Sequence, residues 1–401
     1  MLTYGLIQEA ADRLKKRVRH TELIASPPFS EQLGHPVLFK CENLQKTGAF
    51  KLRGAMNFMT AHPRGSLAQG VTAASAGNHA QGVAFGADLL GIPARIFMPE
   101  STPPQKVQAT RDLGAEVLLT GANFDESFAA AQQDSAQHGT VFIHPFDDPL
   151  VMAGQGTIGL EILRQLPEVD TVIVPIGGGG LLAGIVTAIK ETHPQVRVVG
   201  VESAAAPCMY RAVRDNRISE VPLRSTIADG IAVKKAGQAT MPIIRRLVDD
   251  LVLVEEEEIA LAIVALLERG KLLVEGAGAV PLAALLNHRI KGNLGRTVCL
   301  LSGGNIDVRT LAVVVERGLL AASRYLKLRI ELADTPGALA SLAADLAALR
   351  ANIHDITHDR RTRGVMLGST AVLLLLETRG RDHAAEIVAG LQRQGYQLAQ
   401  E

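Results

Sequence analysis

Short apolar segments alternate with longer segments of helical periodicity from Val37 to about Leu320. Each apolar segment is followed by an amphipathic stretch or by a run of small residues that suits a helix. The apolar segments are VLFKC, VTAAS, ARIFM, EVLLT, TVIVPI, VRVVGV and TVCLLS. Almost continuous apolar strands alternating with helices are typical of a parallel sheet with both faces covered. The pattern therefore predicts an α/β architecture for this region.

The pattern changes after the connecting segment RGLLAASRY, at residues 317–325. Apolar and polar residues then alternate from Leu326 to Leu332 as in a half-buried strand, and the turn Asp334–Gly337 precedes a helical stripe of leucines. A strand near 353–359, a turn at 362–364, a strand near 371–376, a helix near 387–391 and a last short strand follow. This βαββαβ order predicts a ferredoxin-like unit. We therefore expect one region at residues 1–322 and a separate domain at 326–401.

The composition is that of a globular protein, and the length of the chain predicts two domains. The 401-residue chain is 47% hydrophobic and 20% charged. Lysine and arginine total 41, equal to the total of aspartate and glutamate, and aromatic residues make up only 3%. Because neither a basic field nor a set of stacking aromatic residues stands out, we expect no nucleic-acid partner.

Cysteine usage and the apolar runs bear on where the protein works. Cys41, Cys208 and Cys299 lie far apart without CxxC spacing, so we expect neither a disulfide framework nor a zinc site. The N-terminus has apolar residues at helical spacing among charges, unlike a signal peptide, and no apolar run is long enough to span a bilayer. These features predict a cytoplasmic protein with no membrane partner.

The strongest chemical signal is GGGGL, Gly177 to Leu181, which follows the strand TVIVPI and opens the helix LLAGIVTAIK. Glycines let the backbone approach closely, so successive N–H groups at a helix N-terminus can bind a phosphate. A tight strand-to-helix turn needs fewer than four glycines. We therefore interpret this turn as a phosphate site.

Lys51 lies in the run KTGAFKLRGA, among small residues. A partly desolvated amine loses its proton more readily and can form a Schiff base with an aldehyde. Taken alone, Lys51 reads as a solvated surface charge, because Lys46 and Arg53 lie in the same stretch. The glycine turns farther along the chain favour the catalytic interpretation.

Two further turns offer polar groups next to predicted strands. SAGNHAQG, Ser75 to Gly82, supplies a hydroxyl, backbone amides and Asn78 at a helix start, which suits a carboxylate or a ring hydroxyl. The alternative for this turn is an ordinary helix cap by Ser75 or Asn78. LSGGN places Ser302 at the end of a late strand, where ligands of open α/β sheets collect, although a turn serine is the simpler reading.

Two apparent motifs carry no function in our interpretation. Gly154–Gly159 matches GxGxxG, but no convincing strand precedes it, and a small-residue helix start is the better explanation. His354 and His358 would share one face of a strand without a third metal ligand nearby. We expect them to be surface side chains.

Together these motifs resemble the fold-type II pyridoxal-phosphate enzymes, with the architecture of the tryptophan synthase β subunit, and most closely the short threonine dehydratases (threonine ammonia-lyases). KTGAFKLRGA, SAGNHAQG, GGGGL, EGAGA and LSGGN occur in the family's order over residues 1 to about 320. The tail resembles one C-terminal ACT domain through Asp334–Gly337 and Asn352-Ile353. The resemblance implies two α/β subdomains with parallel sheets covered by helices, followed by an ACT regulatory domain.

The resemblance also implies a role for each motif around pyridoxal 5′-phosphate. Lys51 would be the catalytic residue and would hold the cofactor as a Schiff base. The other cofactor-binding residues would be Asn78 at the 3′-hydroxyl, Gly177, Gly178, Gly179, Gly180 and Leu181 at the phosphate, and Ser302 at the pyridine nitrogen. The loop around the substrate carboxylate would consist of Ser75, Ala76, Gly77, Asn78 and His79.

The activity that the resemblance implies is dehydration and deamination of L-threonine to 2-oxobutanoate and ammonia, with slower conversion of L-serine to pyruvate. A serine or hydroxyaspartate dehydratase of the same fold is the alternative. Outside the lyases, a dehydrogenase using Gly154–Gly159 and an idle amino-acid sensor built on the tail remain open.

Two positions depart from the serine racemases of this fold. Those enzymes carry a second serine at the position of Ala76, so we expect elimination without racemisation. Their cation site uses an acidic residue shortly after the counterpart of Glu202, where this chain has Cys208, so we expect no bound metal. We also expect a homo-oligomer, dimer or tetramer, with an amino-acid effector at the ACT domain and a place in isoleucine synthesis or threonine breakdown.

Overall fold

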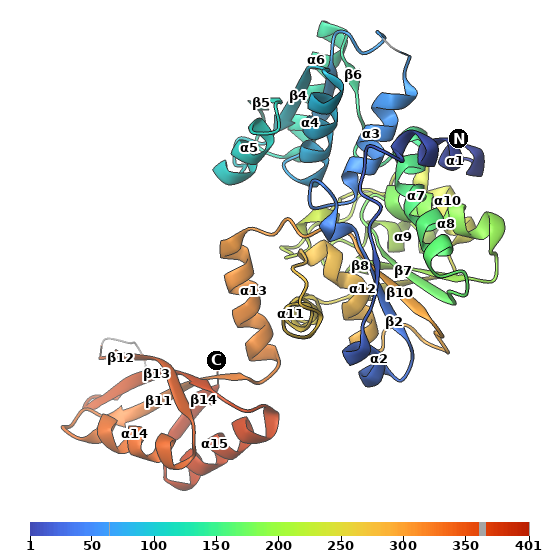
Figure 1. Cartoon of the computed structure of the whole chain (residues 1–401). Coiled ribbons are helices and arrows are strands. Elements are labelled where there is room, and N and C mark those ends of the chain that lie inside the picture. Colours follow the sequence, from blue (N-terminus) through green and yellow to red (C-terminus); the bar gives the residue numbers. More distant parts are fainter. Residues whose placement is uncertain (64, 361–365, 401) are drawn as a thin grey trace. The chain divides into compact units, whose positions relative to one another are not determined.

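The computed structural model describes residues 1–63, 65–360 and 366–400, which form two compact units (Figure 1). The first unit is Met1–Asp307, and the second begins at Val308. The boundary expected from sequence, between 322 and 326, lies between helix α13 (Val308–Ala321) and strand β11 (Tyr325–Ala333), after the start of the second unit. The helix α13 thus groups with the second unit. Within the described part of the chain, no helix is both long and apolar enough to cross a bilayer.

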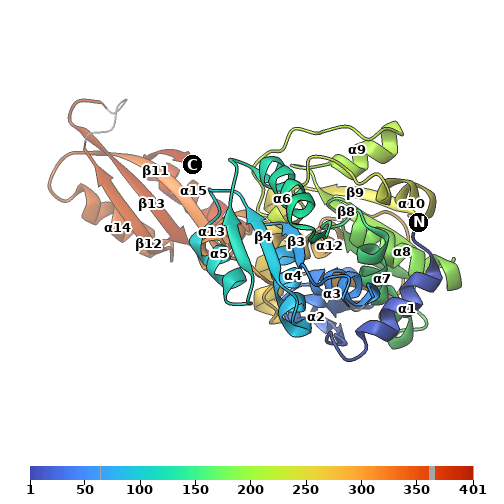
Figure 2. The same cartoon turned by 90° about the horizontal axis from the view of Figure 1, so that it is seen from above.

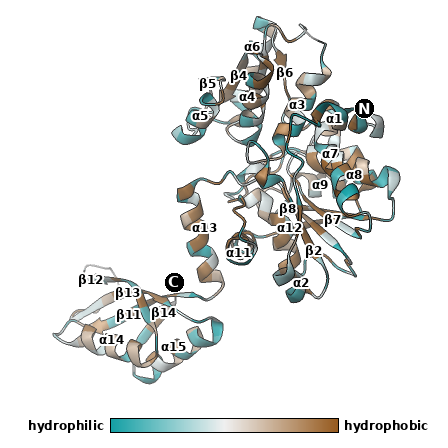
Figure 3. Cartoon of the chain, in the orientation of Figure 1, coloured by the Kyte–Doolittle hydropathy of each residue, from teal (hydrophilic) through white to brown (hydrophobic). Residues whose placement is uncertain are grey.

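The larger sheet of the first unit has the strand order β1-β2-β10-β7-β8-β9. Its strands are β1 (Leu23–Ala25), β2 (Val37–Cys41), β10 (Thr297–Leu301), β7 (Thr171–Pro175), β8 (Arg197–Ser203) and β9 (Asp250–Val254). All neighbours are parallel except β1, which pairs antiparallel with β2. Every residue of β7 and β10 is buried, and β7 is largely apolar (Figure 3). Strands buried on both faces confirm the prediction of a covered parallel sheet.

The smaller sheet has the order β5-β4-β3-β6, and all its pairs are parallel. Its strands are β3 (Val71–Ala74), β4 (Ala94–Met98), β5 (Glu116–Leu119) and β6 (Val141–Phe142). Ala73 and Ile96 pack in the cluster formed with helices α3 and α4, whereas the next residues, Ala74 and Phe97, pack against Ala131 of α6. Successive side chains of a strand point to opposite faces, so this sheet is covered on both faces as well.

The helices of the first unit are α1 (Tyr4–Leu14), α2 (Pro27–Leu33), α3 (Lys51–Ala61), α4 (Asn78–Leu90), α5 (Pro104–Arg111), α6 (Phe124–His138), α7 (Pro149–Gln165), α8 (Gly180–Thr192), α9 (Cys208–Asp215), α10 (Thr240–Leu247), α11 (Glu256–Ala265) and α12 (Gly276–Leu286). Short helical turns lie at Glu42–Leu44, Asp229–Ile231 and Leu266–Gly270. The helix α3 lies between α4 and α7 and packs against both (Figure 2).

Glycines allow this close packing around α3. A Cβ on Gly82 of α4 would lie 3.0 Å from the backbone nitrogen of Leu52, and one on Gly154 of α7 would lie 2.7 Å from the Cα of Gly54. Gly156, also in α7, approaches the carbonyl of Gly184 in α8 in the same way. The GxGxxG match is therefore a helix-packing sequence. The expectation of a helix start there was wrong in detail, because α7 begins five residues earlier, at Pro149.

The second unit contains the βαββαβ order predicted for the tail, preceded by α13. Its elements are β11, α14 (Ala338–Ala348), β12 (Asn352–Asp359), β13 (Ser369–Glu377), α15 (Arg381–Arg393) and β14 (Gln397–Gln400). The antiparallel sheet has the order β12-β13-β11-β14. His354 and His358 are exposed on β12, as expected. The turn predicted at 362–364 lies outside the described residues.

Candidate active site

The turn before Lys51 meets the motif LSGGN at the end of β10. Phe50 N donates a hydrogen bond to the carbonyl of Ser302 over 3.0 Å, and Ala49 forms an isolated β-bridge with Gly303. Ser302 is buried, with 2% of its surface exposed. Because β2 and β10 are parallel neighbours, their carboxyl ends lie at one edge of the sheet. Two motifs separated by about 250 residues in sequence are thus adjacent in space.

Lys51 is the first residue of α3, and its amine is partly shielded from solvent. Nζ donates a hydrogen bond to the carbonyl of Pro145 over 2.8 Å and lies 5.3 Å from the centroid of the Phe50 ring. Desolvation lowers the pKa of Lys51 to about 8, while the nearby Glu275 carboxylate acts in the opposite direction. The amine can therefore lose its proton close to neutral pH, as a Schiff-base lysine requires.

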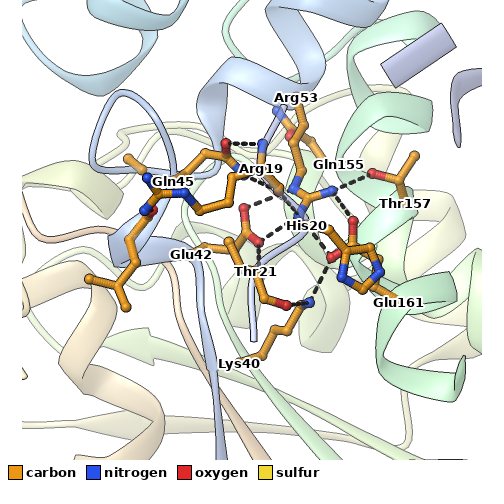
Figure 4. Close-up of polar contacts among 12 residues, drawn as sticks. Arg19, His20, Thr21, Lys40, Glu42, Gln45, Arg53, Gln155, Thr157 and Glu161 are labelled. Carbon is orange, nitrogen blue, oxygen red and sulfur yellow. Dashed lines mark hydrogen bonds and ion pairs between the residues drawn. The ribbon is translucent and has the colours of Figure 1, made fainter. Parts of the chain in front are cut away.

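A buried network of charges anchors α3 just beyond Lys51 (Figure 4). The Arg53 guanidinium donates to Glu42 over 2.8 Å and to Glu161 of α7 over 2.6 Å, and Lys40 Nζ donates to Glu161 over 2.6 Å. Two cations thus face two carboxylates inside the protein. Arg53 is fully buried, whereas Lys46 of the same motif is exposed.

The glycine turn joins β7 to α8, as the sequence predicts. Gly179 has φ +97°, and a Cβ there would lie 2.6 Å from the terminal methyl of Met209 and 2.7 Å from the Thr240 hydroxyl. A Cβ on Gly178 would overlap the Phe146 ring. Since Gly180 and Leu181 open α8, their amides lack intrahelical acceptors and could hold a phosphate.

Asn78 is the first residue of α4, but its side chain does not cap the helix. The N-cap is Gly77, with no side-chain cap bond. Asn78 Nδ2 donates to the Glu275 carboxylate over 2.8 Å, and Asn305 Nδ2 donates to Asn78 Oδ1 over 2.9 Å. The Asn78 side chain therefore does not act as a helix cap, which was the alternative interpretation. SAGNHAQG, EGAGA and LSGGN meet through these bonds.

Glu275 is a central residue that reasoning from single motifs missed. It is the N-cap of α12 and is buried, with 5% of its surface exposed. Burial raises the pKa of its carboxyl to about 7, although the hydrogen bond from Asn78 lowers it. It also interacts electrostatically with Lys51. The only sequence signal was its place at the head of EGAGA.

The remaining residues of the predicted carboxylate loop surround Asn78. Ser75, Ala76 and Gly77 are half-buried, and a Cβ on Gly77 would meet no atom within 4 Å, so there is open space beside the loop. The His79 imidazole is buried, with Nε2 3.0 Å from the carbonyl of Ile143. Burial lowers the pKa of His79 to about 3, so the ring is neutral.

The region around Glu202 is arranged as a helix cap. The buried Glu202 carboxylate accepts hydrogen bonds from the amides of Met209 (3.0 Å) and Tyr210 (2.8 Å) at the start of α9, and Cys208 Sγ lies 3.4 Å from it. Burial raises the pKa of Glu202 to about 7. Among the residues that the structure describes, no group of three or more His, Cys, Asp or Glu side chains could hold a metal ion.

Comparison with known proteins shows the family to which the chain belongs. The family model described as "Pyridoxal-phosphate dependent enzyme" matches residues 14–303, and the chain belongs to this family. Over 396 residues it is 68% identical to an L-threonine ammonia-lyase of Geobacter sulfurreducens, covering 99% of this chain and 98% of the relative. It is 45% identical over 399 residues to an L-threonine ammonia-lyase of Thermotoga maritima, covering 99% of both.

Solved structures resemble the catalytic part of the chain. The processed form of threonine deaminase isoform 2 from Solanum lycopersicum superposes with a TM-score of 0.73 at 38% identity, covering 78% of this chain and 93% of that structure. Maize serine racemase gives a TM-score of 0.75 at 35% identity, covering 80% and 98%. These matches confirm the predicted fold-type II architecture.

Proposed function

We propose that the protein is a pyridoxal-phosphate-dependent L-threonine ammonia-lyase that converts L-threonine to 2-oxobutanoate and ammonia. The main support for the cofactor site is that the loop at Pro145 and Phe146 contacts both Lys51 and the glycine turn. The Pro145 carbonyl accepts the Lys51 hydrogen bond, and the Phe146 ring packs against Gly178 of the glycine turn. A reactive amine and a phosphate turn therefore lie on the two sides of one short loop. The full-length identity to threonine ammonia-lyases supports the choice of substrate.

The donors present fit pyridoxal phosphate group by group. Lys51 would hold the cofactor aldehyde, the amides from Gly177 to Leu181 its phosphate, Asn78 its 3′-hydroxyl and Ser302 its pyridine nitrogen. When bound, the cofactor withdraws electrons from the substrate Cα and so acidifies the Cα–H bond. Ser302, unlike an aspartate, would not keep the pyridine nitrogen protonated.

Lys51 also serves as the base in this proposal. When Nζ is not bonded to the cofactor, it would be free to accept the proton of the substrate Cα–H. Its pKa of about 8 leaves part of the amine neutral at physiological pH. The backbone from Ser75 to His79 would orient the substrate carboxylate. Because the His79 ring is buried, that residue would contribute through its amide.

We also propose the finer features implied by the resemblance. They are slower turnover of L-serine, a cytoplasmic location, a homo-oligomer, and an ACT domain at 326–401 that binds an amino-acid effector. The second candidate function is a serine or hydroxyaspartate dehydratase, since the same donors suit any β-hydroxy amino acid.

A keto-acid assay with L-threonine, L-serine and hydroxyaspartate tests the proposal. Lys51→Ala should abolish the Schiff-base absorption of the purified protein and lower turnover by orders of magnitude. Lys46→Ala is the matched control, because this lysine of the same motif is exposed and donates to the carbonyl of Arg17. Near-native activity of Lys51→Ala would exclude the assignment, and a preference for another substrate would select the second candidate.

A further inference from the structure

The carbonyl of Gly178, in the middle of the glycine turn, accepts hydrogen bonds from residues at the start of α10 and just before it. Thr240, the first residue of α10, is fully buried and donates its hydroxyl hydrogen to this carbonyl over 2.7 Å. The amide of Gly237 donates to the same oxygen over 3.2 Å. Two donors therefore fix the direction of one carbonyl in a turn whose glycines would otherwise leave it free to rotate.

This direction determines where the next amide points. The peptide between Gly178 and Gly179 is trans, as are the other peptides in the described ranges, so its C=O and N–H lie on opposite sides. With the carbonyl turned toward Thr240, the Gly179 N–H points away from α10. The amides of Gly180 and Leu181 follow at the start of α8, where the helix offers them no acceptor.

Thr240 is itself held by Asp147, which lies in the same loop as Pro145 and Phe146. The Asp147 carboxylate accepts hydrogen bonds from the amides of Gln238 (2.8 Å), Ala239 (2.9 Å) and Thr240 (3.2 Å) at the start of α10. A carboxylate at a helix N-terminus is stabilising, because it complements the unpaired amides and the helix dipole. Asp147 directly follows Phe146, so one loop contacts Lys51, the glycine turn and α10.

We infer that Thr240 is a positioning residue for the phosphate of the cofactor, and that Asp147 holds Thr240 in place. The Thr240 hydroxyl sets the Gly178–Gly179 peptide so that the Gly179 N–H joins the amides of Gly180 and Leu181 around one phosphate. This inference rests on the proposed function, because it requires that the glycine turn binds the phosphate of pyridoxal phosphate.

The test compares two cofactor forms that differ only in the phosphate. Dissociation constants for pyridoxal phosphate and for pyridoxal are measured with the full-length protein after removal of its cofactor. Thr240→Val removes the hydroxyl at nearly constant volume. It should weaken pyridoxal phosphate binding about tenfold or more, because a charge-assisted amide bond to phosphate is lost, and should leave pyridoxal binding unchanged.

Two variants serve as controls. Thr240→Ser keeps the hydroxyl and should bind both forms as the native protein does. Thr187→Val, in α8, removes a hydroxyl that donates to the carbonyl of Ala183 over 2.8 Å, away from the turn, and should also leave both affinities unchanged.

Asp147→Asn keeps an acceptor but loses the charge. It should weaken pyridoxal phosphate binding alone, by less than Thr240→Val, and it provides the test if Thr240→Val does not fold.

Equal weakening of both forms, or of neither, in Thr240→Val would overturn the inference and leave Thr240 as a packing residue. Failure of the proposed function looks different. If the native protein binds the cofactor but does not convert threonine, the affinity comparison still decides the role of Thr240. If the native protein binds pyridoxal as tightly as pyridoxal phosphate, the turn holds no phosphate and both proposals fail.

Discussion

Glu161→Gln tests whether the buried charges around α3 depend on each other. Glu161 accepts from the guanidinium of Arg53 over 2.6 Å and from Lys40 Nζ over 2.6 Å (Figure 4). The Arg53 and Lys40 side chains are 1% and 0% exposed, so neither can turn to water. The variant would leave two buried cations with a single carboxylate, that of Glu42.

Removing one partner from a buried ion pair costs about 3–5 kcal/mol. We expect the lower end, about 3 kcal/mol, because the cations keep other acceptors. Arg53 retains its two-pronged contact with Glu42, and Lys40 retains the carbonyl of Thr21 and the amide oxygen of Gln165. Lys40→Met in the same chain removes the surplus cation, so the double variant should lose less stability than the two single variants added together.

Urea unfolding of the cofactor-bound protein, followed by circular dichroism, measures the effect. With a urea dependence of about 1–3 kcal/mol per molar, the midpoint of the catalytic unit should fall by about 1 M or more. The matched control is Glu116→Gln, which breaks a pair with Arg95 whose side chains are 25% and 58% exposed, and it should cost about 0–1 kcal/mol. A loss in Glu161→Gln no greater than in this control would refute the reasoning.

Five other outcomes are expected. Gly178→Val should weaken retention of pyridoxal phosphate, measured by dialysis, because its Cβ would overlap the Phe146 ring, and excess cofactor should partly restore activity. The rate of cofactor rebinding should rise with pH and level off above about 8, since only the neutral Lys51 amine reacts. Glu275→Gln should shift this pH dependence of the rebinding rate to lower pH, because it removes the charge that raises the Lys51 pKa. Stopped-flow absorbance across pH measures the rebinding rate of the native protein and of the variant. Ala76→Ser should increase the D-serine formed from L-serine, measured by chiral chromatography, by supplying a proton donor. Isoleucine should alter the threonine saturation curve by a coupling of about 1–3 kcal/mol, and an unchanged curve would argue for a purely structural tail.

The elements that sequence predicted best are those whose pattern is local and uninterrupted. The strand β7 and the glycine turn after it were read directly from TVIVPI and GGGGL, and the alternation from Leu326 to Leu332 gave β11. Gly154–Gly159 was harder, because close helix packing and phosphate binding both need glycine. The approach of Gly154 to α3 and of Gly156 to α8 decides between them, and neither neighbour is visible in the local sequence.

The residues that sequence reasoning missed act across long separations. Asp147 and Thr240 are 93 residues apart, and each is an ordinary polar residue outside any motif. Glu275 and Asn78 are separated by 197 residues. These pairs are brought together by the order of the strands in the sheets. A short stretch of sequence therefore never contains both members of a pair.

Arg53 shows why a local charge pattern misleads most at such a site. Three cations within eight residues suggest a solvated surface, and for Lys46 that is correct. A charge can be buried only with a partner, and the partners of Arg53 lie 11 and 108 residues away, at Glu42 and Glu161. The burial of Arg53 therefore follows from the packing of α3 on α7, which the glycines of α7 allow. In this chain the sequence that resembles a cofactor loop, Gly154–Gly159, instead lets α7 approach the helix that begins with Lys51.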